Sequence, residues 1–329
     1  MKKICFFGFL YFTSSAYLQG QALEIYRQDS FISYRGLSIV ENNIWISGSK
    51  GSVGKSANGG NTWQWYTVKG YEKNEFRDIE AFDDRTAVVM SISAPAFILK
   101  TTDGGNTWKK VYENAHPSMF LDAMAFKNNK EGIVIGDPIE NNIFVAETKD
   151  GGNSWSETSI LKLPAAGAGE VFFAASGSNI VFAGNRYYIV SGGLLSRIFF
   201  NKKAIRLPTL QGQQMTGANG LAIQNNTILV AGGDYHNLQR TDSVFSYSTD
   251  GGATWHLPRV MPGGYRSSVC FAGKDTAITC GITGIDISYD AGKTWKNISK
   301  EGFNTCTYSK EQHSVFFAGN NGKLGKMHL

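Results

Sequence analysis

The sequence predicts an all-β protein, a seven-bladed β-propeller made of four-stranded antiparallel blades. A turn motif recurs along the chain at intervals of 45, 47, 100 and 40 residues. Short apolar segments flank each copy, and glycine is abundant (38 residues) while proline is scarce (7). Repeats of this length with strand-like flanks are typical of propellers, which place one blade in each period. The interval of 100 is two periods with one motif missing.

The recurring motif joins an Asp or Asn, one or two glycines and a tryptophan. Its five copies read SANGGNTW (56–63), TTDGGNTW (101–108), TKDGGNSW (148–155), STDGGATW (248–255) and SYDAGKTW (288–295). The acid or amide accepts hydrogen bonds within its own turn, glycine supplies positive φ angles, and tryptophan packs between blades. We therefore assign structural roles to these pairs: Asn58 and Trp63, Asp103 and Trp108, Asp150 and Trp155, Asp250 and Trp255, Asp290 and Trp295.

Seven units can be aligned in chain order. They begin near Tyr34, Phe76, Phe120, Glu170, Asn219, Tyr265 and Phe303. Each unit opens with an apolar strand, continues with a second strand, and has a third strand that runs into the motif. The fourth unit carries a plain hairpin turn at 201–203 instead of the motif, and the seventh stops after its third strand. We expect residues 23–28 to complete the last blade, because closure removes free sheet edges.

The triplet Gly54-Lys55-Ser56 follows several glycines and looks like part of a phosphate-binding loop. That loop requires a glycine five residues before Gly54, and Ser49 stands there. A turn and a strand follow the triplet, where a phosphate-binding loop would continue into a helix. The sequence therefore predicts no nucleotide site. No glycine cluster opens a helix either, so we expect no nicotinamide, flavin or other cofactor.

The first 20 residues have the layout of a signal peptide. Lys2 and Lys3 precede an apolar run over residues 4–12 that is too short to span a membrane. We expect residues 21–329 to form one propeller domain that is secreted or periplasmic and monomeric. The net charge of +5 is spread along the chain without a basic run, so no nucleic-acid partner is expected.

Cysteine and histidine usage excludes the common metal sites. Cys270, Cys280 and Cys306 remain after the leader, and no CxxC pair exists. A bridge between Cys270 and Cys280 stays open, although buried free thiols are favoured. The five histidines show neither HxH nor HExxH spacing, and we expect no metal.

The chain resembles the Asp-box, or BNR-repeat, propellers, a group that includes sialidases, sortilin-type receptors and photosystem II stability/assembly factors. The finer likeness is to the assembly-factor branch. It is carried by segments 33–63, EFRDIEAF (75–82), KTTDGGNTW (100–108), MFLDAMAF (119–126) and GIVIGDP (132–138). The resemblance implies the propeller fold and a role in binding or assembly, whereas the Asp box alone assigns no activity.

Propellers bind ligands around one mouth of the central channel, where the inner strands begin and the second strands end. The candidate ligand-binding residues there are Arg35, Arg77, Asp78, Asp122, Asp137, Glu170, Asp234, Tyr235 and Arg266. Arginine forks could hold a carboxylate or sulfate, and paired acids could cleave a glycosidic bond. Alternatively the charges pair with each other to tie blades together, Arg77 with Asp122 for example.

The leading hypothesis is an exported, non-catalytic propeller that uses this mouth to bind a protein or glycan in the cell envelope, as an assembly or stability factor. The alternative is a glycoside hydrolase, sialidase-like or otherwise exo-acting. The early Arg-Ile-Pro segment of sialidases is absent, and Tyr34-Arg35-Gly36-Leu37 is the nearest equivalent.

Overall fold

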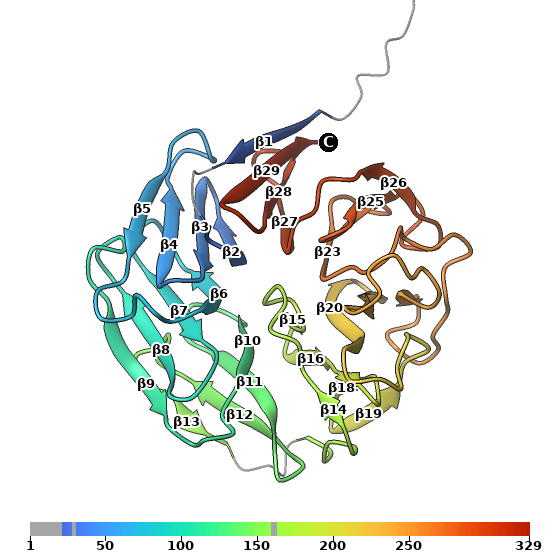
Figure 1. The fold of residues 1–329 in the computed structure, drawn as a ribbon, viewed down its shortest axis with the longest axis horizontal. Helices are drawn as coiled ribbons and strands as arrows, with labels where there is room; N and C mark the ends of the chain where they lie inside the picture. The colour runs from blue at the N-terminus through green and yellow to red at the C-terminus, as the bar shows by residue number, and fades with distance from the viewer. Residues whose placement is uncertain (1–21, 28–30, 159–162) are drawn as a thin grey trace, which may run out of the picture.

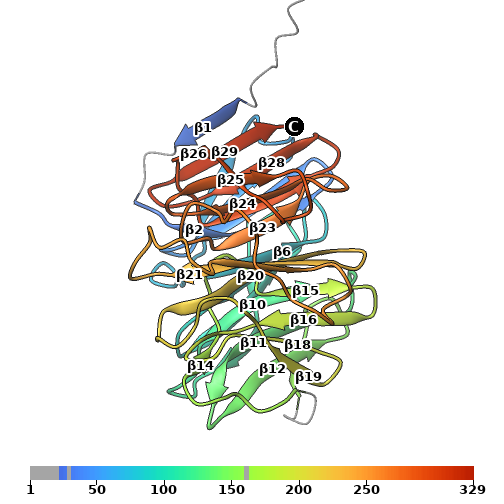
Figure 2. The ribbon, with the colours of Figure 1, turned by 90° about the vertical axis from the view of Figure 1, so that its right-hand side faces the viewer.

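A computed structural model of the chain describes residues 22–27, 31–158 and 163–329, and the predicted signal peptide lies outside them. Within the described residues the regular secondary structure is β-strand throughout. Seven sheets surround a common axis (Figure 1), and Figure 2 shows the ring edge-on. The predicted fold class is confirmed. No helix in the described part of the chain is long and apolar enough to span a bilayer.

Each blade is an antiparallel meander that runs from the channel outward. The first blade comprises β2 (Tyr34–Val40), β3 (Asn43–Gly48), β4 (Ser52–Ser56) and β5 (Gln64–Thr67). The second comprises β6 (Phe76–Ala81), β7 (Ala87–Ser91), β8 (Ala96–Thr101) and β9 (Lys109–Asn114). The third comprises β10 (Leu121–Phe126), β11 (Gly132–Ile139), β12 (Asn142–Thr148) and β13 (Ser156–Glu157).

The remaining blades follow the same order with one variation. The fourth comprises β15 (Ile180–Ala183), β16 (Arg186–Val190), β18 (Arg197–Phe200) and β19 (Lys203–Arg206). The fifth comprises β20 (Thr216–Gln224), β21 (Thr227–Asp234) and β22 (Phe245–Ser248), extended by the short β14 (Glu170–Val171) and β17 (Gly192–Gly193). The sixth comprises β23 (Ser268–Phe271), β24 (Ala277–Gly281), β25 (Gly284–Ser288) and β26 (Lys296–Ser299).

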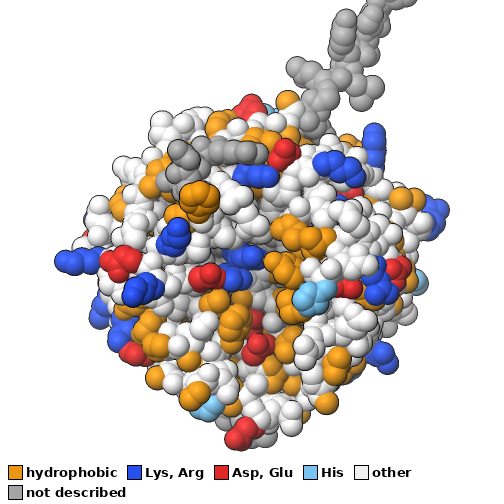
Figure 3. Space-filling view, in the orientation of Figure 1, with side chains coloured by type: hydrophobic (Ala, Val, Ile, Leu, Met, Phe, Trp, Pro, Cys, Tyr) orange, Lys and Arg blue, Asp and Glu red, His pale blue; other side chains and the backbone are white. Residues whose placement is uncertain are grey.

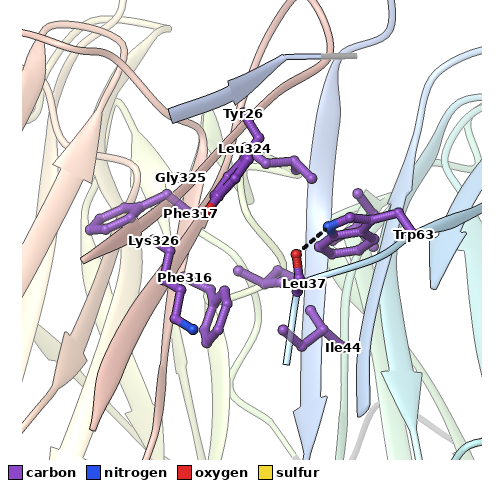
Figure 4. A pocket seen from close by; sticks show the side chains of 11 residues that line it. Tyr26, Leu37, Ile44, Trp63, Phe316, Phe317, Leu324, Gly325 and Lys326 are labelled. Atoms are coloured by element: carbon purple, nitrogen blue, oxygen red, sulfur yellow. Dashed lines mark hydrogen bonds between the residues drawn. The ribbon is translucent and has the colours of Figure 1, made fainter. Parts of the chain in front are cut away.

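The N-terminal strand closes the ring, as predicted. β1 (Leu23–Arg27) pairs antiparallel with β29 (Lys323–His328), outside β28 (Ser314–Ala318) and β27 (Thr305–Ser309). Figure 4 shows side chains of the first and last blades pointing into the seam between them, where only about 10 Å³ stays empty. The indole of Trp63 is fixed there by a hydrogen bond from its Nε1 to the Gly60 carbonyl, 3.0 Å long.

Seven clusters of buried hydrophobic side chains hold the ring together, one at each junction between neighbouring blades. In five of them the tryptophan of an Asp box packs against the preceding blade. The other two junctions precede the blades without a box. Phe172 and Phe199 fill the junction of blades three and four, and Phe303 and Phe317 fill that of blades six and seven.

Each Asp box is a closed set of short hydrogen bonds, shown by the second copy. The Thr101 hydroxyl donates to Asp103 Oδ1 at 2.9 Å and accepts from the Gly105 N–H at 3.0 Å. Asp103 Oδ1 also accepts from the Thr107 N–H at 2.9 Å. Hydrogen bonds from Thr107 lower the pKa of Asp103 to about 2. Its carboxylate is therefore committed to the turn.

A lysine in the third strand reaches the Asp box of the following blade. Lys100 Nζ donates to the Gly151 carbonyl at 2.8 Å, and Lys326 Nζ lies 3.5 Å from the Gly59 carbonyl. Lys55 Nζ lies 3.2 Å from where a Cβ on Gly104 would stand. The lysine of the triplet that resembles a phosphate loop therefore faces a neighbouring turn.

Replacing Lys100 with methionine tests this contact between blades. The variant keeps the aliphatic stem but removes the donor to the Gly151 carbonyl, so we expect the free energy of unfolding to fall by about 1 kcal/mol. Urea denaturation followed by tryptophan fluorescence measures it. Lys109→Met, at an exposed position of β9, is the matched control. Equal losses in both variants would show that the hydrogen bond between blades adds nothing.

The predicted start of the fourth unit is wrong. The inner strand of that blade is β15, beginning at Ile180 rather than near Glu170. The apolar segment after Glu170 resembles an inner strand in composition. However, Glu170 and Val171 pair with β17, whereas the carbonyls of Ala174, Ala175 and Ser176 accept hydrogen bonds from side chains of other blades. Figure 1 shows the chain before β15 extending toward the centre of the ring.

Candidate functional site

Residues 172–178, here called the channel segment, cross the central channel and contact most of the blades. On one side the Phe172 N–H donates to Asp137 Oδ1 at 2.9 Å. Farther along, the Ser176 hydroxyl donates to the Ser267 carbonyl at 2.7 Å. The main-chain carbonyl of Ser176 accepts from Thr305 Oγ1 at 3.2 Å. The segment thus forms a floor across the channel.

Glycine is required where the channel segment passes the second blade. Gly177 has a φ of +69°, and a Cβ there would stand 2.3 Å from Asp78 Oδ1. The Asp78 carboxylate accepts hydrogen bonds from the N–H groups of Ile79 (2.8 Å) and Met124 (2.7 Å). Burial, and then the charge of Glu80, raise the pKa of Asp78 well above its ordinary value. Asp78 therefore lies beneath the floor rather than in an open site.

Above the floor lies a pocket of about 540 Å³, a volume suited to a ligand or a partner side chain. Its wall comes from inner-strand starts and second-strand ends, as expected for a channel mouth. It is lined by Arg35, Arg77, Phe120, Asp137, Gly169, residues 171–175, Gln214, Met215, Asn219, Tyr235 and Tyr265. In the space-filling view, hydrophobic, basic and acidic side chains surround the centre of the ring (Figure 3).

The two arginines of the pocket differ in how fully they are bonded. Arg77 donates from Nε and Nη2 to Glu75 and from Nη1 to the Ala174 carbonyl at 3.0 Å. Arg35 donates from Nη1 to the Ala175 carbonyl at 3.2 Å and forms no ion pair with a carboxylate among the described residues. Burial, and then the charge of Arg77, lower the pKa of Arg35. Arg35 thus has guanidinium nitrogens available to a ligand.

One carboxyl lines the pocket, and a second lies behind it. Burial raises the pKa of Asp137 to about 6, against the hydrogen bond from the Phe172 N–H. Asp122 is fully buried, and burial together with the charge of Asp137 raises its pKa well above the ordinary range. Arg77 and the Ala174 N–H lower this pKa, but neither Asp122 oxygen accepts a hydrogen bond of normal geometry among the described residues. The predicted ion pair between Arg77 and Asp122 does not form.

Three of the candidate residues are occupied by contacts within the fold. Glu170 is buried against Arg197 of β18 and accepts from the Gly167 N–H at 2.7 Å. Asp234 accepts from the N–H groups of His236 and Asn237 at 2.9 and 3.0 Å.

Arg266, fully buried, donates from Nε to Asp286 Oδ2 at 2.6 Å. Arg266 joins the approach to β23 with Asp286 of β25 and with Thr283 in the turn before β25, and neither Arg266 nor Asp286 lines the pocket.

Of the aromatic and amide side chains in the wall, the candidate list included Tyr235 but not Tyr265, Asn219 or Gln214. Tyr265 packs edge-on against Tyr235 with ring centroids 5.5 Å apart, and its hydroxyl donates to Asn219 Oδ1 at 3.0 Å. Tyr265 had been assigned only as the start of a unit, and Asn219 had been placed at an inner-strand start without being made a candidate ligand-binding residue. Their position at an inner-strand start, the same rule that singled out Arg35, was the signal that could have placed them in the wall. Met215 and Gln214 carried no comparable signal.

The chain is thus an Asp-box β-propeller of seven blades. Its channel segment crosses the central channel and closes the pocket at one end. The BNR/Asp-box repeat matches residues 246–257, the copy that contains Asp250. The resemblance to Asp-box propellers is thereby confirmed for the repeat and the fold. None of the curated proteins compared with the chain matches its sequence.

Solved structures similar to the chain are propellers of low sequence identity. "YCF48 bound to D1 peptide" has a TM-score of 0.68 and 16% identity, over 93% of this chain and 97% of that chain. YCF48 from Cyanidioschyzon merolae has a TM-score of 0.61 and 18% identity, over 93% and 99%. The Neurospora crassa Pan2 WD40 domain has a TM-score of 0.64 and 15% identity, over 94% and 96%. At these identities the likeness concerns the fold.

Within the described residues, no group of three or more His, Cys, Asp or Glu side chains is arranged to hold a metal ion.

Proposed function

We propose that this chain is a non-catalytic binding propeller that holds a segment of a partner protein in the pocket at its channel mouth. The observation that carries the proposal is Arg35, which forms no ion pair within the described ranges and lies in a pocket of about 540 Å³ above a main-chain floor. Such a guanidinium recognises an anionic group by charge-assisted hydrogen bonds. Tyr235, which is 41% exposed, adds an aromatic surface at the same mouth.

The comparisons support a protein as the partner. One similar structure is titled as YCF48 bound to a D1 peptide, so a propeller of this fold can hold a peptide. The likeness of the sequence to assembly factors points the same way. We propose a role in the assembly or stability of a complex, with the chain exported by residues 1–20 and acting as a monomer in the cell envelope.

The pocket offers less to the glycosidase alternative. Glycosidases use two carboxyl groups that both face the sugar. Asp137 carries the only carboxyl among the residues that line the pocket, while Asp122 is buried behind it and Asp78 lies beneath the floor. A raised pKa, as Asp137 has, would suit a general acid, but no second acid faces it across the pocket. The wall is therefore better suited to binding than to hydrolysis.

A photo-crosslinker at Gln214 tests the binding site directly, because this side chain is exposed and lines the pocket. We expect it to form an adduct with one protein in living cells. Arg35→Gln should reduce that adduct about tenfold, since it removes the charge-assisted contact. Arg186→Gln, exposed on β16, is the matched control. Unchanged adduct in Arg35→Gln would contradict the proposed site.

Enzyme assays separate the two functions. The purified chain should not turn over panels of aryl glycosides and sialosides. Turnover that disappears in Asp137→Asn would overturn the non-catalytic reading in favour of hydrolysis.

A further inference from the structure

The junction between blades six and seven contains all three cysteines of the propeller. Cys270 lies on β23, Cys280 on β24 and Cys306 on β27, and all three are free thiols in one hydrophobic cluster. This is one of the two junctions without an Asp-box tryptophan. Since no His, Cys, Asp or Glu group among the described residues is arranged for a metal, the cluster calls for another explanation.

The pairing of β23 with β24 places Cys270 and Cys280 on the same face of their hairpin. Cys270 lies opposite Ile278 and Cys280 lies opposite Ser268, so the two cysteines are diagonal neighbours on one face of their hairpin. Diagonal positions are about 7–8 Å apart, which exceeds the usual span of a disulfide. A direct bridge within the hairpin is therefore disfavoured.

Cys306 approaches that face from the next blade. Its N–H donates to Ser268 Oγ at 3.3 Å, and the same hydroxyl lies 3.4 Å from its carbonyl oxygen. Ser268 and Cys270 are two residues apart on β23 and so share a face. The Cys306 thiol donates to the carbonyl of Ile278 at 3.9 Å, and Ile278 lies directly opposite Cys270 in the β23–β24 pair. All three cysteines belong to the same hydrophobic cluster. Cys306 is thus the common neighbour of the other two.

Solvent access distinguishes those two neighbours. Cys270 is partly exposed, whereas Cys280 and Cys306 are 0% and 4% exposed. Of the three cysteines, Cys270 is therefore the one that an oxidant from solution would meet first. Burial raises the pKa of Cys306, but the neighbouring thiols of Cys270 and Cys280 outweigh burial and hold this pKa well below its ordinary value. Cys306 is therefore suited to attack a disulfide formed at Cys270.

We propose that Cys270 and Cys306 form a redox site that closes into a disulfide between blades six and seven. The neighbouring Cys306 thiol, and then burial, raise the pKa of Cys270 well above its ordinary value, so Cys270 must give up its thiol proton to react. On losing that proton, Cys270 exchanges with a disulfide oxidant RSSR and gives a Cys270–SR mixed disulfide and one RS⁻. The Cys306 thiolate then attacks Cys270 Sγ, forms the Cys270–Cys306 bond and releases the second RS⁻. The two cysteines lose two electrons and two protons in total, and RSSR is reduced to two RSH.

The test is peptide mapping of the full chain after treatment with oxidised or reduced glutathione. Free thiols are alkylated in denaturant, and the chain is digested with trypsin without reduction. Each cysteine then falls in its own peptide, 267–274, 275–293 or 301–310. We expect peptide 267–274 joined to 301–310 after oxidised glutathione only, with a rise in melting temperature. Three alkylated peptides, a stable glutathione adduct or any other pairing overturns the proposal.

Two variants test whether the disulfide forms because the oxidant reacts first at Cys270, or merely because the thiols lie close together. Cys280→Ser should keep the linked peptide, because Cys280 takes no part in either exchange. Cys270→Ser should abolish it and leave Cys280 and Cys306 as alkylated thiols, since both are buried. Loss of the linkage in Cys280→Ser, or a Cys280–Cys306 bond formed at the wild-type rate in Cys270→Ser, would contradict the assigned roles.

Discussion

Replacing Arg266 with methionine is expected to lower the free energy of unfolding by about 3–5 kcal/mol, the largest effect of any single change considered. Arg266 has no exposed surface, and its guanidinium bonds to Asp286, to the Tyr265 carbonyl and to the Thr283 hydroxyl. Methionine matches much of the volume but leaves the Asp286 carboxylate, 1% exposed, without its counter-charge. Chemical denaturation monitored by circular dichroism measures the loss.

The double variant Arg266→Met, Asp286→Leu shows how much stability is lost because the Asp286 carboxylate is left unpaired and how much because packing changes. With both charges removed, no buried ion is left unpaired, and most of the lost stability should return. Asp275→Leu, in the β23–β24 turn and exposed, is the control for adding leucine. A double variant as unstable as Arg266→Met alone would show that shape, rather than charge, is what this pair contributes.

The repeat could be predicted because its chemistry is local. Asp103 closes its turn with residues no more than four positions away, so the motif carries its own structural reason. Ring closure was predictable for a related reason, since a blade lacking one strand needs another. Lys100 escaped notice because its partner, the Gly151 carbonyl, belongs to the next blade.

The fourth blade shows where a local pattern misleads. Residues 170–175 have the apolar composition of an inner strand, yet Arg35 and Arg77 hold the carbonyls of Ala175 and Ala174 in the channel. Composition cannot distinguish main chain that pairs with a strand from main chain that is held by side chains. The channel segment is fixed only once the ring has brought those arginines together.

The same limit applies to the site. The rule that inner-strand starts and second-strand ends meet at the channel mouth placed Arg35, Arg77, Asp137 and Tyr235 around one pocket. It could not tell them from Arg266 and Glu170, whose partners Asp286 and Arg197 lie on other strands of the same region. Which charge is free and which is paired depends on side-chain contacts between strands, and spacing along the chain does not encode them.

Asp122→Asn is expected to stabilise the protein by about 1–3 kcal/mol near neutral pH, because it replaces a buried carboxyl that lacks a normal hydrogen bond by a neutral amide of the same shape. Burial raises the pKa of Asp122 well above 3.8 in the folded chain. Between the two pKa values the folded state holds a proton that the unfolded state releases. Stability of the wild type must therefore fall as pH rises through this window.

The difference in the free energy of unfolding between Asp122→Asn and the wild type reports on Asp122 alone. The other buried acids with raised pKa values, Glu80, Asp78 and Asp137, are present in both proteins. The gain of the variant should be near zero below pH 4 and grow with pH by at most about 1.4 kcal/mol per unit. Urea denaturation from pH 4 to 8 measures it, with the exposed Asp84→Asn as control. If the stability difference between variant and wild type did not change with pH, Asp122 would have to be ionised in the folded protein. Arg77 and the Ala174 N–H would then stabilise its buried charge next to the channel segment.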